Sequence, residues 1–159
     1  MVQTWAEVQN AYQRRLDLTP NLVSTVKGMA GFEQETLTKI AEARSNAMSV
    51  TTSEISEETY RKQSGLQDTL AAASNRLIAV VEKYPVLKGT DAFRGLQVQL
   101  EGNERRIKVA RADFNGAVKD YNQAVRSFPK NMVAGVFGFD AKQGFTATEG
   151  AERNVEIKF

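Results

Sequence analysis

Apolar residues recur at alternating spacings of three and four along most of the chain, which is the period of an amphipathic helix. The pattern predicts four long helices, at about residues 2–30, 33–50, 57–84 and 90–128. No stretch alternates apolar and polar residues for long enough to predict a convincing strand. Because short connections place consecutive helices antiparallel, we expect an all-α, up-down-up-down four-helix bundle over residues 1–130.

The last predicted helix has the most regular pattern. Its large apolar positions fall seven residues apart: Phe93, Leu100, Ile107, Phe114, Tyr121 and Phe128. A second column, three residues after each of the first five, holds mostly small side chains: Leu96, Asn103, Ala110, Ala117 and Ala124. A strict period of 3.5 residues indicates coiled-coil-like packing of long helices. Asn103 is the polar exception, and it either fixes the register inside the core or faces solvent at an end of the bundle.

Prolines divide this pattern. Pro20 falls inside the first helix, where it offers no amide to the carbonyl of Leu16, so we expect a kink or a restart there. Pro85 ends the third helix, and Pro129 follows the fourth. Beyond them, residues 131–159 form an apolar, glycine-rich segment and a polar tail, which we expect to be irregular.

Composition narrows the possible chemistry. The 159 residues include neither cysteine nor histidine, so the chain has no disulfide, no Cys/His zinc site, no histidine base and no cysteine nucleophile. The remaining acids, lysines and tyrosines form no pattern that names a reaction. We therefore expect no catalytic residue, no metal and no cofactor, and the prediction is that the protein is not an enzyme.

Charge gives no reason to expect nucleic-acid binding. The net charge is only +2, whereas nucleic-acid binders usually concentrate basic residues on one face. The segment 93–130 is more basic, but its charges are not interleaved with aromatic residues as a stacking surface requires.

A polar cluster is expected between the first and last helices. Arg15 lies on an apolar stripe, and a buried arginine needs a partner. Its candidate partners are Asp17, Glu101, Glu104 and Asp113. If Trp5 lies near Phe128, then Asp17 reaches the level of Arg111, and an Asp17–Arg111 contact is predicted. The candidate cluster comprises Arg15, Asp17, Arg111 and Asn115, which form either structural ion pairs or an anion pocket.

Six apolar residues gather around the end of the last helix: Phe128, Met132, Val133, Val136, Phe137 and Phe139. The apolar run 132–139 is too short to span a bilayer. In an up-down-up-down bundle, this end returns to the start of the first helix. The six residues therefore either fold back over the open end of the bundle, or contact a membrane surface or a partner.

An ordered set of short motifs runs through the chain. They are Trp5-Ala6, Gln13-Arg14-Arg15-Leu16-Asp17-Leu18-Thr19-Pro20-Asn21-Leu22-Val23, Glu82-Lys83-Tyr84-Pro85, Phe114-Asn115, Tyr121-Asn122, Phe128-Pro129 and Phe137-Gly138-Phe139. In this order, the set resembles the bacterial LemA family over essentially the whole chain. Thr19, Asn103 and Arg105 depart from the residues usual in that family, so the polar side chains of the last helix are not treated as an invariant site.

The resemblance implies a soluble four-helix domain with no established enzymatic activity. It also implies that one N-terminal transmembrane helix precedes the segment that begins at Met1. We therefore expect a single-pass protein of the bacterial membrane that binds an envelope or membrane-protein partner through its helix faces. Arg14 and Arg15 near the membrane end favour the cytoplasmic side. The alternative function is a sensor of a small ligand or anion, with a polar pocket between helices.

Overall fold

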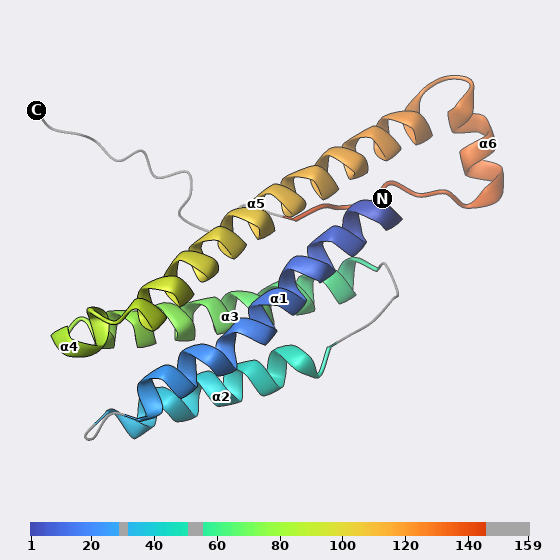
Figure 1. Cartoon of the computed structure of the whole chain (residues 1–159). Coiled ribbons are helices and arrows are strands. Elements are labelled where there is room, and N and C mark those ends of the chain that lie inside the picture. The colour runs from blue at the N-terminus through green and yellow to red at the C-terminus, as the bar shows by residue number, and fades with distance from the viewer. Residues whose placement is uncertain (29–31, 51–55, 146–159) are drawn as a thin grey trace, which may run out of the picture.

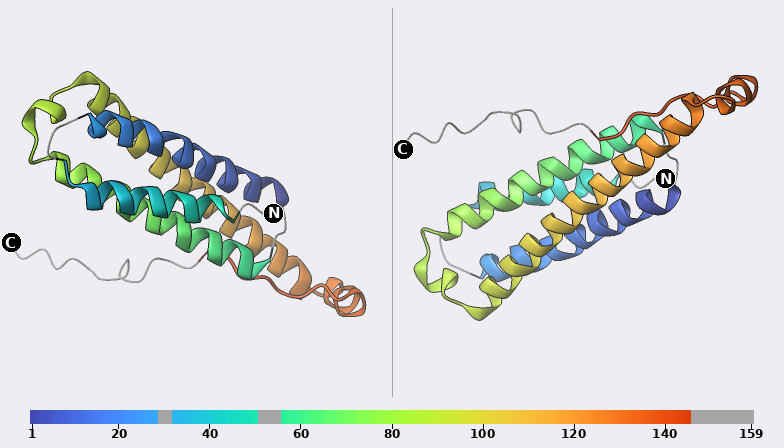
Figure 2. Two further views of the ribbon diagram at one scale, coloured as in Figure 1. Left: turned by 90° about the horizontal axis from the view of Figure 1, so that it is seen from below. Right: turned by 90° about the horizontal axis from the view of Figure 1, so that it is seen from above.

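The computed structural model describes residues 1–28, 32–50 and 56–145, and within these ranges it contains helices and no strand (Figure 1). The four long helices are α1 (Val2–Lys27), α2 (Gln34–Met48), α3 (Glu57–Val81) and α5 (Asp91–Arg126). Two short helices are α4 (Pro85–Lys88) and α6 (Lys130–Phe137). Consecutive long helices run in opposite directions, which confirms the all-α, up-down prediction (Figures 1 and 2).

Two of the helices begin at side-chain caps. Ser56 Oγ accepts a hydrogen bond from the amide of Thr59 at the start of α3. Thr90 does the same for the amide of Phe93 at the start of α5. These hydroxyls satisfy amides that have no partner within the helix.

Pro20 does not make α1 restart, because the helix is continuous from Val2 to Lys27. The carbonyl of Leu16 would normally accept a hydrogen bond from the amide at position 20, which proline lacks. It accepts one from another donor instead. Arg44 of α2 donates from its Nε to this oxygen at 3.1 Å. A neighbouring helix thus replaces the hydrogen bond that the sequence removes.

The core divides into two clusters. The aliphatic cluster includes residues of all four long helices and of α4: Leu16, Leu18, Leu22, Val26, Leu37, Ile40, Ala43, Ala47, Leu70, Leu77, Val81, Leu87, Phe93 and Leu100. The aromatic cluster comes from α1, α3 and α5: Trp5, Val8, Ala11, Tyr12, Tyr60, Ile107, Ala110, Phe114 and Val118. Among the described residues, α2 contributes nothing to the aromatic cluster, and Phe145 packs against that cluster instead.

The segment after Pro129 is more regular than predicted. Residues 130–137 form α6, which ends at Gly138 in the left-handed conformation (φ 68°). The amide of Phe139 closes this turn on the carbonyl of Ala134 at 2.9 Å. The chain then returns along the bundle to Phe145 (Figure 1). Residues 146–159 of the predicted polar tail and residues 29–30 of the first predicted helix lie outside the described residues.

Candidate functional site

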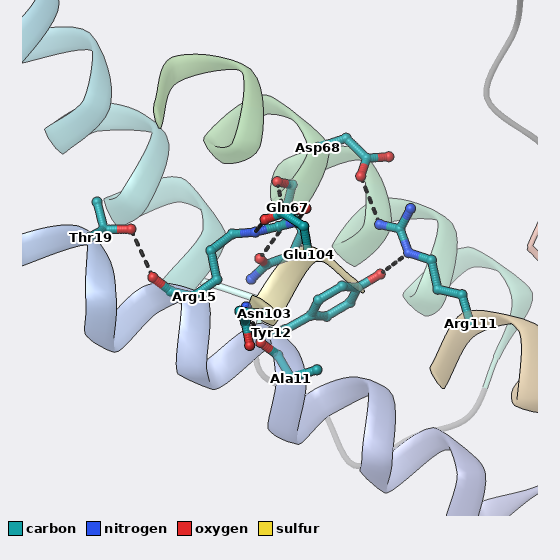
Figure 3. A network of polar contacts seen from close by, with 9 residues as sticks. All are labelled: Ala11, Tyr12, Arg15, Thr19, Gln67, Asp68, Asn103, Glu104 and Arg111. Atoms are coloured by element: carbon teal, nitrogen blue, oxygen red, sulfur yellow. Dashed lines mark hydrogen bonds and ion pairs between the residues drawn. The ribbon is translucent and has the colours of Figure 1, made fainter. Parts of the chain in front are cut away.

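Arg15 is the centre of a polar layer between α1, α3 and α5 (Figure 3). The layer comprises Tyr12, Arg15, Gln67, Asp68, Asn103, Glu104 and Arg111. Its side chain is only 2% exposed. The Nε atom donates to Oε1 of Glu104 at 2.8 Å, and Nη2 bonds the second oxygen of the same carboxylate. The Nη1 atom donates to the backbone carbonyl of Gln67 at 2.8 Å and to its side-chain oxygen at 3.1 Å. Arg15 therefore joins α1 to both α3 and α5, and Glu104 is one of its four predicted partners.

Arg111 forms a second, separate set of contacts in this layer. Its Nε donates to the hydroxyl of Tyr12 at 2.9 Å, and its Nη2 donates to Asp68 at 2.7 Å. The guanidinium carbon lies 5.4 Å from the ring centres of both Tyr12 and Phe145, within the range of a cation–π contact. Burial acts to lower the pKa of Arg111, but Tyr12 and Asp68 outweigh it and raise that pKa. Arg111 is therefore a fixed cation.

The predicted Asp17–Arg111 contact was wrong, because the two helices pair in a different register. The ring of Trp5 lies 5.5 Å from that of Phe114, which is two heptads before the expected Phe128. Asp17 instead accepts a hydrogen bond from Gln13 on its own helix at 2.9 Å.

Asp17 lies on a different face of the molecule, in a groove between α1 and α5. The groove has a volume of about 670 Å³. Its lining combines acidic, basic and small residues: Glu7, Asn10, Ala11, Gln13, Arg14, Asp17, Asn103, Arg105, Arg106, Val109, Ala110 and Asp113. Charges of both signs in one open groove suit a polar protein surface better than an anion.

Asn103 takes the first of its two predicted roles. It is 1% exposed and donates from Nδ2 to the carbonyl of Ala11 at 3.1 Å, so it pins the register of α5 on α1. Within the described part of the chain, its Oδ1 has no hydrogen-bond partner, and neither do Oε1 of Gln63 and Nε2 of Gln67. The polar layer is therefore only partly satisfied by protein groups.

Asn115, the fourth residue of the predicted cluster, binds Phe145. Its side-chain amide donates to the carbonyl of Phe145 at 2.9 Å and accepts from the amide of Phe145 at 2.7 Å. Arg111 and Asn115 thus share Phe145, which they contact through its ring and its backbone respectively. Arg15 and Asp17 have other partners, so the four residues do not converge on one site.

The six apolar residues around the end of α5 are all exposed. Their exposed fractions run from 55% at Phe139 to 81% at Phe128 and Val136. They do not cover the end of the bundle, because Phe145, further along the chain, contacts Trp5 there instead. An apolar hollow of about 370 Å³ lies between α5 and α6, lined by Tyr121, Ala124, Val125, Lys130, Val133, Ala134 and Phe139. We call Phe128, Met132, Val133, Val136, Phe137 and Phe139 the apolar end.

Several residues of the polar layer were not predicted from the sequence. Gln67 and Asp68 of α3 supply the partners of the two arginines. The sequence did carry a signal for Gln67, which falls on the helical 4–3–4 spacing of Gln63, Gln67, Leu70 and Ser74. All four side chains are buried in the structure. Asp68 is an exposed acid among many, and its sequence position carries no such signal.

The described residues contain no group of three or more acidic side chains placed to hold a metal ion. Within the same ranges, no helix is both long and apolar enough to cross a membrane.

Comparison with known proteins gives distant relatives. Magnetosome proteins MamQ 1 and MamQ 2 of Paramagnetospirillum magneticum are each 36% identical over 73 residues, which is 46% of this chain and 27% of the relative. Protein LemA of Metamycoplasma hominis is 25% identical over 127 residues, 80% of this chain and 55% of that protein. The chain thus spans between about a quarter and about half the length of the curated relatives it matches. The family model described as LemA family matches residues 4–159, so the chain belongs to the LemA family.

Proposed function

We propose that this protein is a non-enzymatic interaction domain held at a bacterial membrane, on its cytoplasmic side, where it binds an envelope or membrane-protein partner through its helix faces. The observation that carries the proposal is the apolar end. Contiguous exposed apolar surface is uncommon on soluble chains and marks contact with a membrane or a protein.

The position of the apolar end supports this orientation. Met1 and α6 lie at the same end of the molecule, and α4 lies at the other (Figure 1). A membrane anchor joined to the N-terminus would therefore bring α6 to the bilayer. Arg126 and Lys130 are exposed beside the apolar residues, and basic side chains are attracted to anionic headgroups.

The geometry gives the anion-sensor alternative less support. Arg15 directs its guanidinium donors to Glu104 and Gln67, and Arg111 directs its donors to Tyr12 and Asp68. Each guanidinium is already paired with a carboxylate, which reduces its attraction for an anion. The helix faces offer a better binding surface, above all the mixed-charge groove between α1 and α5.

Site-specific photocrosslinking of the full-length protein in its host membrane tests the proposal. A crosslinker at Phe137, in the apolar end, is expected to react with lipid or with a membrane protein. The matched control is Val86 of α4, which is equally apolar and 80% exposed at the opposite end. Equal labelling at both positions would contradict the orientation.

A third position tests the partner. Val109 is 59% exposed and lines the groove between α1 and α5. A crosslinker there is expected to give one protein adduct of reproducible size. Finding no adduct in repeated preparations would count against partner binding at this face.

A further inference from the structure

Two asparagines on α5 hold the backbone of the returning segment in the same way. Asn115 exchanges both of its amide hydrogen bonds with the backbone of Phe145. Asn122 donates to the carbonyl of Lys142 at 2.6 Å and accepts from the amide of Lys142 at 2.7 Å. Each side chain thus imitates the edge of a strand, which donates to and accepts from one residue of its neighbour.

The spacing of the two asparagines matches that of the residues they bind. Asn115 and Asn122 are seven residues apart on a helix, a rise of about 10.5 Å. Phe145 and Lys142 are three residues apart, and an extended polyproline II chain repeats every three residues with a rise of about 9.3 Å, so it turns both residues toward the same side. This face of α5 therefore fits an extended backbone, and the asparagines recognise it without reference to side chains.

Side-chain specificity comes from an aromatic pocket at one end of this face. The ring of Phe145 lies 5.4 Å from Phe114, 5.5 Å from Tyr60 and 6.1 Å from Trp5. The guanidinium of Arg111 lies 5.4 Å from the same ring. The pocket therefore selects an aromatic side chain, by both ring packing and cation–π attraction.

The residue before the aromatic side chain is also restricted. A Cβ atom on Gly144 would collide with the side-chain oxygen of Asn115 and lie 3.1 Å from its Cγ. That oxygen is held by the amide of Phe145, so it cannot move without loss of the hydrogen bond. The groove therefore favours glycine followed by an aromatic residue.

We propose that this face of α5 is a binding groove for an extended peptide of a partner protein that carries glycine followed by an aromatic residue. Residues 142–145 of this chain are its intramolecular occupant, which the partner displaces. Displacement is feasible because the segment belongs to no helix and its contacts to Asn122 are exposed. The tethered segment competes at an effective concentration on the order of millimolar. The inference rests on α5 and the returning segment, and it does not depend on the apolar end.

The test uses the full chain carrying Phe145→Ala and a capped synthetic peptide with the sequence of residues 139–145. Trp5 is the only tryptophan and lines the pocket, so its fluorescence reports occupancy. The peptide is expected to bind Phe145→Ala at least tenfold more tightly than the wild-type chain. A peptide with alanine in place of the glycine should bind at least tenfold more weakly.

Phe139→Ala is the matched control, because Phe139 lies in the same segment but is 55% exposed. This variant should bind the peptide as weakly as the wild type does. Gly144→Val provides a second way to expel the segment while the pocket residues stay intact, and it should give the same tenfold gain.

Circular dichroism first establishes that each variant keeps the wild-type helicity. Absence of peptide binding to a folded Phe145→Ala or Gly144→Val chain would overturn the proposal, as would equal binding of the two peptides. Sedimentation of the wild type should show a monomer. A dimer that Phe145→Ala abolishes would assign the groove to a second copy and would also overturn it.

Discussion

The two halves of the bundle have cores built from different kinds of side chain. In the half built on the aliphatic cluster, four long helices surround mainly leucine, valine, isoleucine and alanine side chains. In the half built on the aromatic cluster, three helices remain, and Trp5, Tyr60 and Phe114 take up the space. The returning segment completes this half with Phe145.

The difference shows how larger side chains can fill the space in the half where, among the described residues, the short helix α2 contributes nothing to the core. Aromatic residues bury more area than aliphatic ones and add directional ring contacts. The cost is dependence on a segment outside the helices, since Phe145 is held in the cluster by hydrogen bonds of that segment to Asn115, Asn122 and Tyr60. We therefore expect the aromatic half to open more readily than the aliphatic half.

The largest effect is expected when one large core side chain is removed from each half in turn. Phe114 and Leu77 are both fully buried, in the aromatic and the aliphatic cluster respectively. Phe114→Ala should lower the free energy of unfolding by about 3–5 kcal/mol, and Leu77→Ala by about 2–5 kcal/mol. Urea denaturation followed by circular dichroism measures both.

Amide hydrogen exchange then locates the damage. Phe114→Ala should speed exchange in the first turns of α1 and α3 more than in α2, whereas Leu77→Ala should affect α2 more. Identical exchange patterns in the two variants would show that the halves do not behave as separate units.

A substitution in the polar layer, between the two halves, should lower the free energy of unfolding by a smaller amount. Glu104→Ala leaves the buried guanidinium of Arg15 without its carboxylate, and we expect a loss of about 2–3 kcal/mol. This is below the 3–5 kcal/mol typical of buried pairs, because Glu104 is 43% exposed. The double variant Arg15→Met/Glu104→Ala should recover part of the loss, since it removes the buried charge itself. A double variant as unstable as the sum of its single variants would refute this explanation.

Alkaline pH should destabilise the aromatic half through its buried tyrosines, and this is the smallest expected effect. Burial raises the pKa of Tyr12 and of Tyr60 above the ordinary value of 10.0. The unfolded chain therefore releases these protons first, so stability is retained below pH 10 and falls as the pH rises beyond it. Denaturant midpoints measured from pH 9 upward should show this decline. Tyr12→Phe/Tyr60→Phe should flatten it, and an unchanged slope would exclude the tyrosines as its cause.

The heptad pattern predicted the faces of the helices but not their register. Phe93, Leu100, Ile107 and Phe114 are buried as expected, whereas Phe128 at the end of the same column is exposed. A repeat of seven looks the same after a slip of two heptads, so pairing Trp5 with Phe128 or with Phe114 satisfies the pattern equally. What distinguishes them is Asn103, whose amide meets the carbonyl of Ala11 only in the observed register.

The site was less predictable than the fold, because its contacts join residues that are far apart in the sequence. Asn115 was singled out from the sequence, but its partner lies 30 residues away in a segment expected to be irregular. The contacts of Arg15 and Arg111 to α3 depend on how three helices meet. Periodicity within one helix carries no information about such a meeting point.

The contact between Arg44 and the carbonyl of Leu16 makes α1 a helix that is not complete by itself. An isolated peptide of this sequence would have an open position in its backbone ladder one turn before Pro20, and water would fill it. In the folded protein α2 fills it, so secondary and tertiary structure form there in a single cooperative step. The proline thereby couples the order of one helix to the docking of the next.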